Sequence, residues 1–291
     1  MNTKPDLFLS SMPCVCPRPP SVWSRIQAGN RLVAVKVIRP LLVAALFLLT
    51  AGCGPKGGGD ALFVVNSSGD SGDDIPGDGI CRTGALSRAC TLRAAIEETN
   101  ALAGSHTIEF DLPAGDLTIL LETALPVVTG ELTIDGETQP GYVHDPIVVI
   151  DGSDVDSPPA NLMETATGSD VILTGLQVLH SYRRGIYAKG TITVQNMTVS
   201  DHDDYGFFAY GETGVTTVQI YDSEFSGNEG TGIGANNTDL FILRAMVSGN
   251  NHGGISVAGG SLDLRNSTIE ENNNPSAGGG ISIVRSTQAS L

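Results

Sequence analysis

Charged and aromatic side chains are both scarce in this chain. Asp, Glu, Lys and Arg make up 16% of its 291 residues, and Phe, Trp and Tyr make up 5%. Helical bundles are rich in Leu, Glu, Lys and Arg, so this composition argues against them. Glycine is abundant instead, with 36 residues, and a hydrophobic fraction of 41% is enough for a core. The composition favours many short strands joined by tight turns, and thus an all-β fold.

Basic residues are the scarcer of the two charges, with 16 Lys and Arg against 32 Asp and Glu and a net charge of −16. Nucleic-acid binding needs basic surface that neutralises phosphates, so we expect no nucleic-acid partner. After residue 53 the chain also lacks a Gly-x-Ser-x-Gly motif, a phosphate loop, an HExxH motif and paired CxxC motifs. Serine-hydrolase, nucleotide and zinc chemistry therefore have no support in the sequence.

The N-terminal region carries a targeting signal. Leu41–Gly52 contains 12 apolar or small residues and follows the basic residues Lys36 and Arg39. Such a segment is too short to span a bilayer, which takes about 20 residues, and is typical of a signal peptide. Residues 1–34 fit no targeting pattern, so we expect translation to start near Val35. The alternative is a long N-terminal region ahead of the apolar segment.

A lipid-attachment motif closes this signal. Thr50-Ala51-Gly52-Cys53 resembles a bacterial lipobox, which implies cleavage before a lipidated Cys53. We therefore predict a signal peptide over residues 1–52 and a lipidated tether over residues 53–60, with a plain secretory signal as the alternative. The residue after the cysteine is Gly54 rather than Asp, which by resemblance to Gram-negative sorting rules implies the outer membrane. The predicted protein is an exported lipoprotein that reaches the membrane through its lipid anchor.

Two cysteines, Cys81 and Cys90, remain in the mature part. Eight residues lie between them in an exported chain, and the neighbouring sequence lacks the additional Cys or His of a metal site. This context predicts a disulfide. Closing so short a loop stabilises a fold by roughly 2–3 kcal/mol in the chain-entropy model.

One helix is expected near the start of the mature chain. Ala61–Asn66 is strand-like, and the Asp-rich stretch 67–79 is a loop. Thr91–Ala103 then places apolar residues on one face at helical spacing, and Gly104 ends the pattern. The residues on that face are Leu92, Ala95, Ile96, Thr99 and Ala103.

From residue 105 the chain is repetitive, with a period near 22 residues. Each repeat has an apolar pair, then a single apolar residue, then a Gly followed by an apolar residue. The pairs are Val171 and Leu173, Ile192 and Val194, Val218 and Ile220, Leu240 and Ile242, and Leu262 and Leu264. The single residues are Val178, Val199, Phe225, Val247 and Ile269, and the Gly steps begin at Gly185, Gly206, Gly232, Gly254 and Gly280. This pattern predicts a right-handed parallel β-helix, because equivalent residues would stack from coil to coil.

A ladder of asparagines is expected inside the solenoid. Asn228, Asn250 and Asn272 share one repeat position, where stacked amides can hydrogen-bond from coil to coil. Ser181 and His202 occupy this position in the two earlier repeats. We therefore expect the ladder to start only at Asn228.

The solenoid has less regular coils at its start. Residues 107–108, 117–119, 132–134 and 147–150 look like earlier strands. A solenoid must cover its first open edge, so residues 61–104 are predicted as an N-terminal cap and residues 105–291 as the β-helix. No capping element follows at the C-terminal end, so we expect further coils beyond this sequence. The alternative is a natural end covered by a partner.

The cap resembles a known family. Cys90-Thr91-Leu92-Arg93-Ala94-Ala95-Ile96 resembles the CSLREA motif of bacterial surface and secreted proteins, which precedes a β-helix in them. The lead-in Pro76-Gly77-Asp78-Gly79-Ile80-Cys81 and the later segment from Ile134 to Tyr142 are also similar to that family. Thr91 stands in place of Ser and Ala94 in place of Glu, which removes any role for that Glu. The resemblance implies an exported β-helix with a pectate-lyase-like fold, often within a larger surface protein, and no common reaction.

An acidic loop is a candidate calcium site. Asp70, Asp73, Asp74 and Asp78 supply carboxylates of the kind that Ca²⁺ binds. The loop is not an EF-hand, because Ala85 stands where the twelfth position, counted from Asp74, needs a Glu. The alternative is a solvated turn, in which Asp favours tight loops.

The stretch Asp201-His202-Asp203-Asp204 has the most catalytic character. Asp201 or Asp203 could bind a cation, and His202 could act as a general base. One repeat earlier, Arg183 and Arg184 are in register with Asp204 and Tyr205, and an Arg there could pair with a carboxylate sugar. The alternative is a polar turn with a local Arg–Asp pair.

The predicted function is that of an exported, lipid-anchored surface protein whose long acidic surface binds a glycan or a surface protein, or serves a structural role. The alternative is a Ca²⁺-dependent polysaccharide lyase, hydrolase or epimerase that acts on acidic glycans. An enzyme should gather Asp201, Asp203 and Arg183 or Arg184 in one groove. A binding protein should present a flat face without that convergence.

Overall fold

The computed structural model describes residues 59–155, 161–212, 214–274, 278–284 and 288–290. They all belong to one unit, Gly54–Leu291. The predicted signal peptide and Cys53 lie outside the described residues. Within them, no helix is long and apolar enough to cross a membrane.

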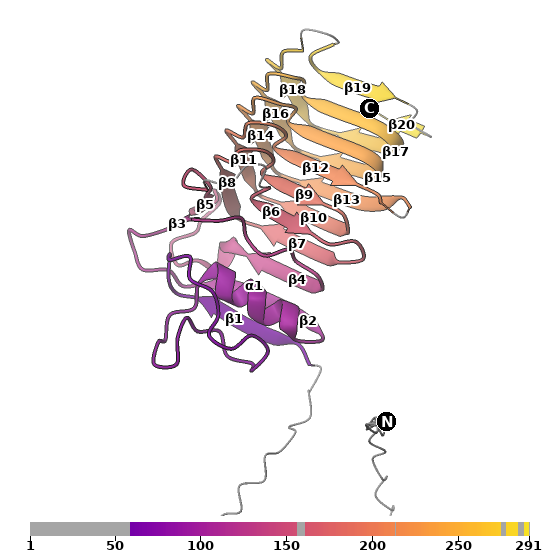
Figure 1. Cartoon of the computed structure of the whole chain (residues 1–291). Helices are drawn as coiled ribbons and strands as arrows, with labels where there is room; N and C mark the ends of the chain where they lie inside the picture. Colours follow the sequence, from indigo (N-terminus) through magenta and orange to yellow (C-terminus); the bar gives the residue numbers. More distant parts are fainter. Residues whose placement is uncertain (1–58, 156–160, 213, 275–277, 285–287, 291) are drawn as a thin grey trace, which may run out of the picture. The chain divides into compact units, whose positions relative to one another are not determined.

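The chain winds through three strand faces in turn, and every strand pair is parallel (Figure 1). Face 1 contains β1 (Ala61–Val65), β2 (Ser105–Phe110), β4 (Glu131–Asp135), β7 (Asp170–Thr174), β10 (Thr191–Gln195), β13 (Thr216–Tyr221), β20 (Gln288–Ser290) and the second halves of β15 (Ile233–Leu243) and β17 (Ile255–Arg265). Face 2 contains β3 (Thr118–Leu120), β5 (Val148–Asp151), β8 (Leu176–Leu179), β11 (Thr198–Ser200), β14 (Glu224–Ser226), β16 (Met246–Ser248) and β18 (Thr268–Glu270). Face 3 contains β6 (Met163–Thr165), β9 (Ile186–Ala188), β12 (Phe207–Tyr210), β19 (Ile281–Val284) and the first halves of β15 and β17. The fold is the predicted all-β parallel helix.

The strand registers confirm the predicted repeat. On face 1, Ile192 lies opposite Val171 and Val218 in the neighbouring coils. On face 2, Val199 lies opposite Val178 and Phe225. Face 3 follows the same rule, and the apolar residues of all three columns point inward into one continuous core.

Residues with a left-handed backbone conformation form two columns at the edges of face 2, where the chain turns. Successive coils place equivalent residues there with positive φ, a conformation that Gly, Asn and Asp adopt most readily. The first column is Gly175, Asn196, Asp222, Arg244 and Asn266, and the second is His180, Asp201, Gly227, Gly249 and Glu271. The Gly and Asn turns noted in the sequence are therefore structural corners of the coil.

The glycines of the first four Gly-apolar steps make room for the ladder. A Cβ at Gly206 would lie 2.8 Å from Nδ2 of Asn228, and a Cβ at Gly232 would lie 2.7 Å from Nδ2 of Asn250. No side chain fits at those separations, so Gly is required where the next coil places its ladder residue.

The predicted cap helix is α1 (Leu92–Ala101), which contacts β1 and β2 (Figure 1). The Thr91 side chain caps it by accepting a hydrogen bond from the backbone N–H of Ala94. The helix ends before Ala103, which was expected on its apolar face. Cys81 and Cys90 form the predicted disulfide, with Cα atoms 5.2 Å apart.

A short 3₁₀ helix, η1 (Gly136–Thr138), follows β4. The next residue, Gln139, is buried, and its amide exchanges two hydrogen bonds with the backbone of Leu112. The Gln139 amide therefore satisfies the backbone N–H and carbonyl of Leu112, which no neighbouring strand pairs in a regular ladder.

Candidate functional site

The aspartates of the acidic loop bind arginines and backbone amides. Asp70 holds Arg93 through both carboxylate oxygens, at 3.0 and 2.8 Å. Asp74 and Asp78 face Arg82, and Asp73 accepts the backbone N–H of Arg82. Within the described ranges, no three His, Cys, Asp or Glu side chains converge as a metal site. The loop is organised by these contacts, and calcium binding stays an untested prediction.

The Asp201–Asp204 stretch is divided between three environments. His202 points into the core and is 0% exposed, whereas Asp201 and Asp203 are exposed on one edge. Asp204 is half-buried, with Oδ2 3.6 Å from Nε of Arg184, and does not line the pocket that contains Asp201 and Asp203. The structure therefore does not gather Asp201, Asp203 and Arg184 into one groove.

His202 extends the ladder, and the expectation that it acts as a general base is wrong. Its Nδ1 accepts the backbone N–H of Ser181 at 3.0 Å, and its Nε2 lies 3.0 Å from the carbonyl oxygen of Val178. The backbone N–H of His202 donates to Oδ1 of Asn228. Burial lowers the pKa of His202 to about 3, so the ring is neutral at physiological pH. A buried neutral imidazole does not reach a ligand outside the solenoid.

The asparagines continue the same column. Nδ2 of Asn228 donates to Oδ1 of Asn250, and Nδ2 of Asn250 donates to Oδ1 of Asn272, both at 2.7 Å. Each Oδ1 also accepts the backbone N–H of the preceding ladder residue. The ladder thus begins with Ser181 and His202, two coils earlier than expected, because the imidazole supplies the same acceptor and donor as an amide.

A pocket of about 250 Å³ contains Asp201 and Asp203. The sequence analysis missed the residue that makes it chemically distinctive, His180. Its Nδ1 lies 3.0 Å from Oδ1 of Asp151, and its side chain is 46% exposed. Ser153 and Tyr182 complete the same wall. The histidine that a ligand can reach at this edge is therefore His180.

Face 3 carries an aromatic platform formed by Tyr187, Tyr205 and Phe208. The ring centroids of Tyr205 and Phe208 are 4.8 Å apart, and those of Tyr187 and Phe208 are 5.9 Å apart. The guanidinium of Arg184 lies over these rings, 4.5 Å from the Phe208 centroid and 4.8 Å from the Tyr187 centroid. Such cation–π contacts stabilise by about 0.5–2 kcal/mol each.

The coil register explains how the rings of the platform pack, with Phe208 tilted by 36° to Tyr187 and by 55° to Tyr205. Tyr187 on β9 is opposite Phe208 on β12, and Phe208 is opposite Gly234 on β15. A Cβ at Gly234 would lie 2.5 Å from both the Phe208 and Tyr205 rings. The absence of that side chain lets two rings lean over the next coil.

Two ion pairs flank the rings. Nζ of Lys189 lies 2.8 Å from Oε1 of Glu164, and this contact raises the pKa of Lys189. Arg184 pairs with Asp204, while burial and the neighbouring Arg183 lower the pKa of Arg184. We call the aromatic platform together with the Arg184–Asp204 and Lys189–Glu164 pairs the binding stripe.

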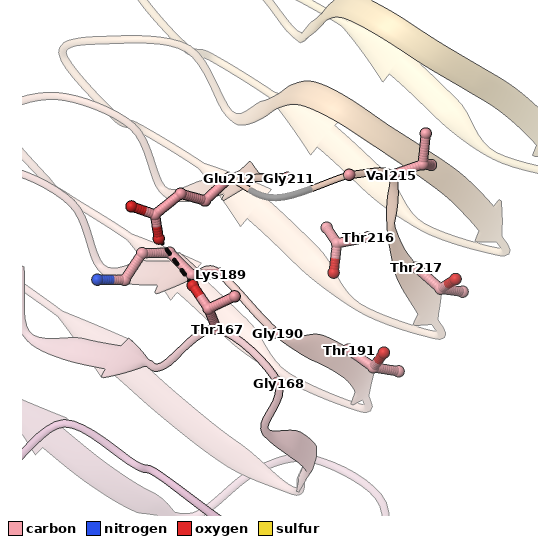
Figure 2. Close-up of a pocket in the computed structure, with 11 residues that line it drawn as sticks. Thr167, Gly168, Lys189, Gly190, Thr191, Gly211, Glu212, Val215, Thr216 and Thr217 are labelled. Atoms are coloured by element: carbon pink, nitrogen blue, oxygen red, sulfur yellow. Dashed lines mark hydrogen bonds between the residues drawn. The ribbon is translucent and has the colours of Figure 1, made fainter.

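A small pocket of about 200 Å³ lies beyond the Lys189 end of the stripe (Figure 2). Hydroxyl and glycine positions line it, and Thr167 donates a 2.8 Å hydrogen bond to Glu212 across one side. Its polar walls suit hydroxyl-bearing groups better than apolar ones.

The sequence contained one signal for the stripe that the repeat analysis did not use. Tyr187 and Phe208 each follow the apolar residue of a Gly-apolar step by one position, so both point outward at the same place in successive coils. Aromatic residues at one outward position of neighbouring coils form a surface cluster.

The comparisons with known proteins agree with this architecture. A family model described as a right-handed beta helix region matches residues 143–291, more than half of the chain. A search of curated proteins found no match. The three stacked faces, the parallel registers and this match show that the chain belongs to the right-handed beta helix family.

Proposed function

We propose that this protein is an exported, lipid-anchored β-helix that is displayed at the outer membrane or cell surface and binds a glycan through the binding stripe. The signal segment and Cys53 motif support the location. The observation that supports the activity is the platform of Tyr187, Tyr205 and Phe208. The rings are half-buried, and the C–H faces of sugar rings can cover the ring surface that the Arg184 guanidinium leaves exposed. The flanking ion pairs supply donors and acceptors for hydroxyl groups.

The binding test uses two variants of the platform and one matched control. Tyr187→Ala and Phe208→Ala should each weaken glycan binding by roughly tenfold, because each removes one stacking surface. The control is Phe241→Ala, since Phe241 on face 1 also lies under an arginine, with Arg265 5.4 Å from its centroid. Isothermal titration against a glycan panel measures the effect. Equal losses in all three variants would contradict a site on face 3.

The lipoprotein proposal has a separate test. Intact-mass analysis of the protein from its own membrane fraction should give the mass of a chain that begins at lipidated Cys53. Cys53→Ser should abolish the lipid and release the protein from membranes. An unlipidated wild-type chain would contradict the anchor and leave the glycan proposal standing.

The second candidate function is an enzyme acting on acidic glycans, and the observation that favours it is the His180–Asp151 pair beside Asp201 and Asp203. A carboxylate that orients an imidazole is a common arrangement in general acid–base catalysis. Incubation with pectate and alginate, with and without Ca²⁺, tests it. Activity that is lost in Asp203→Ala would support this candidate, and an inactive, folded protein would rule it out for these substrates.

A further inference from the structure

The charges of the binding stripe neutralise one another. Arg184 lies against Asp204, and Lys189 lies against Glu164, so the two nearest cations each have a carboxylate partner. Arg183 adds one positive charge beside them. Glu212 adds one negative charge at the Lys189 end.

An anionic sugar fits this arrangement poorly. To use Lys189 it would have to displace the carboxylate of Glu164, which lies 2.8 Å from Nζ. To use Arg184 it would have to approach the carboxylate of Asp204, 3.6 Å from Nε. It would also approach a chain whose net charge is −16. Both effects oppose binding of a polyanion, and the second grows as ionic strength falls.

A hydroxyl group fits it well. Each sugar hydroxyl is both a donor and an acceptor, so it can donate to Glu164 or Asp204 and accept from the cation beside it. Hydrogen bonds of this kind to charged partners are stronger than those between neutral groups. Paired charges next to an aromatic surface therefore recognise hydroxyls together with C–H faces.

The strand direction sets the size of the ligand. Arg184 precedes β9 and Lys189 follows it, with Tyr187 between them. Cζ of Arg184 and Nζ of Lys189 lie 4.8 and 5.6 Å from the Tyr187 ring centroid, so the two charged groups are at most about 10 Å apart. This span suits a short oligosaccharide.

We infer that the ligand of the binding stripe is an uncharged oligosaccharide that lies along the strands of face 3, across the solenoid axis. This inference rests on the proposed glycan-binding function and names its ligand class. It differs from the acidic glycans that the sequence favoured for an enzyme.

The experiment titrates the protein with neutral and anionic oligosaccharides at low and high ionic strength. The neutral probes are cellohexaose, mannohexaose, maltohexaose and laminarihexaose, and the anionic probes are oligogalacturonate and oligoguluronate. We expect a neutral probe to bind with an affinity that changes less than about twofold with salt. Tyr187→Ala and Phe208→Ala should each reduce this affinity about tenfold, and Phe241→Ala should leave it unchanged.

A charge variant sharpens the test. Glu164→Gln frees Lys189 from its partner, so it should weaken binding of the neutral probe a few-fold and strengthen binding of the anionic probes. Binding of only anionic probes, sensitive to the Tyr187 and Phe208 variants, would overturn the uncharged class while leaving glycan binding intact. No binding by any probe to a protein with native circular dichroism would overturn both.

Discussion

The cap and the regular coils satisfy their buried polar groups in different ways. In the cap, buried polar groups have individual partners: Arg93 holds Asp70 and the carbonyls of Thr123 and Ala124, and buried Glu98 accepts the backbone N–H groups of two glycines. In the regular coils, a single contact is repeated from Asn228 to Asn272. The contacts of the cap occur once, whereas the ladder contact can be repeated in any number of coils. The two regions should therefore respond differently to substitution.

The pH dependence of the ladder gives the largest expected difference. The pKa of His202 is about 3 in the folded protein, against 6.5 when unfolded. Between pH 6.5 and 3 the unfolded chain therefore binds a proton at His202 while the folded chain does not. The free energy of unfolding decreases as the pH falls through this range. Near pH 4.5 this loss amounts to about 3 kcal/mol.

His202→Asn should remove that loss, because an amide supplies the same acceptor and donor without titrating. Urea unfolding near pH 7 and near pH 4.5 measures it. If the variant and the wild type lose equal stability on acidification, His202 is not the group responsible. Residues 61–104 of the cap contain no histidine, although Nδ1 of buried His106 in β2 accepts the backbone N–H of Ala61. Opening of helix α1, followed by hydrogen exchange, should therefore change less over this range.

Removing one ladder amide gives the next largest effect. Asn250→Leu keeps the volume but deprives the backbone N–H and Nδ2 of Asn228 of their acceptor. Each buried polar group left without a partner costs about 1–3 kcal/mol, so we expect a loss of roughly 3 kcal/mol in the free energy of unfolding. The matched control is Asn251→Leu, at an exposed neighbour bonded to Glu229. A similar loss in both variants would argue against the ladder as the source.

The smallest of the three effects belongs to the cap. Arg93→Met keeps the apolar stem and removes a guanidinium whose side chain is 12% exposed and paired with Asp70. We expect a loss of about 2 kcal/mol, with earlier protease cleavage in the loop before the helix. Arg82→Met is the control, since that side chain is 24% exposed and should cost less than about 1 kcal/mol. Equal losses in the two variants would show that the contacts of Arg93 stabilise the cap no more than an exposed ion pair does.

The repeat made most of the fold predictable. Inward residues of a solenoid must match those of the next coil, so the register from Val171 to Leu264 was visible as a spacing in the sequence. The disulfide and the cap helix were predictable for local reasons, since Cys81 and Cys90 are close in the chain and the helical face is contiguous.

The site was less predictable because its contacts are not periodic. His180 reaches Asp151 across 29 residues, and Lys189 reaches Glu164 across 25, so neither pair follows the 22-residue spacing. The burial of His202 was missed because Asp neighbours on both sides suggested a polar turn. In the structure, His202 points inward while Asp201 and Asp203 point outward.

The pairing of each ladder residue with a glycine of the preceding coil has a consequence for how such a protein can change in length. Asn250 occupies the space left by Gly232, and Asn228 occupies the space left by Gly206. Inserting a few residues would separate a side chain from its matching gap and place a Cβ against an amide. Duplication of a whole coil copies both the ladder residue and the glycine that makes room for the next one. Unequal recombination between repeats therefore lengthens or shortens this molecule in whole-coil steps, while partial insertions are confined to the corners between faces.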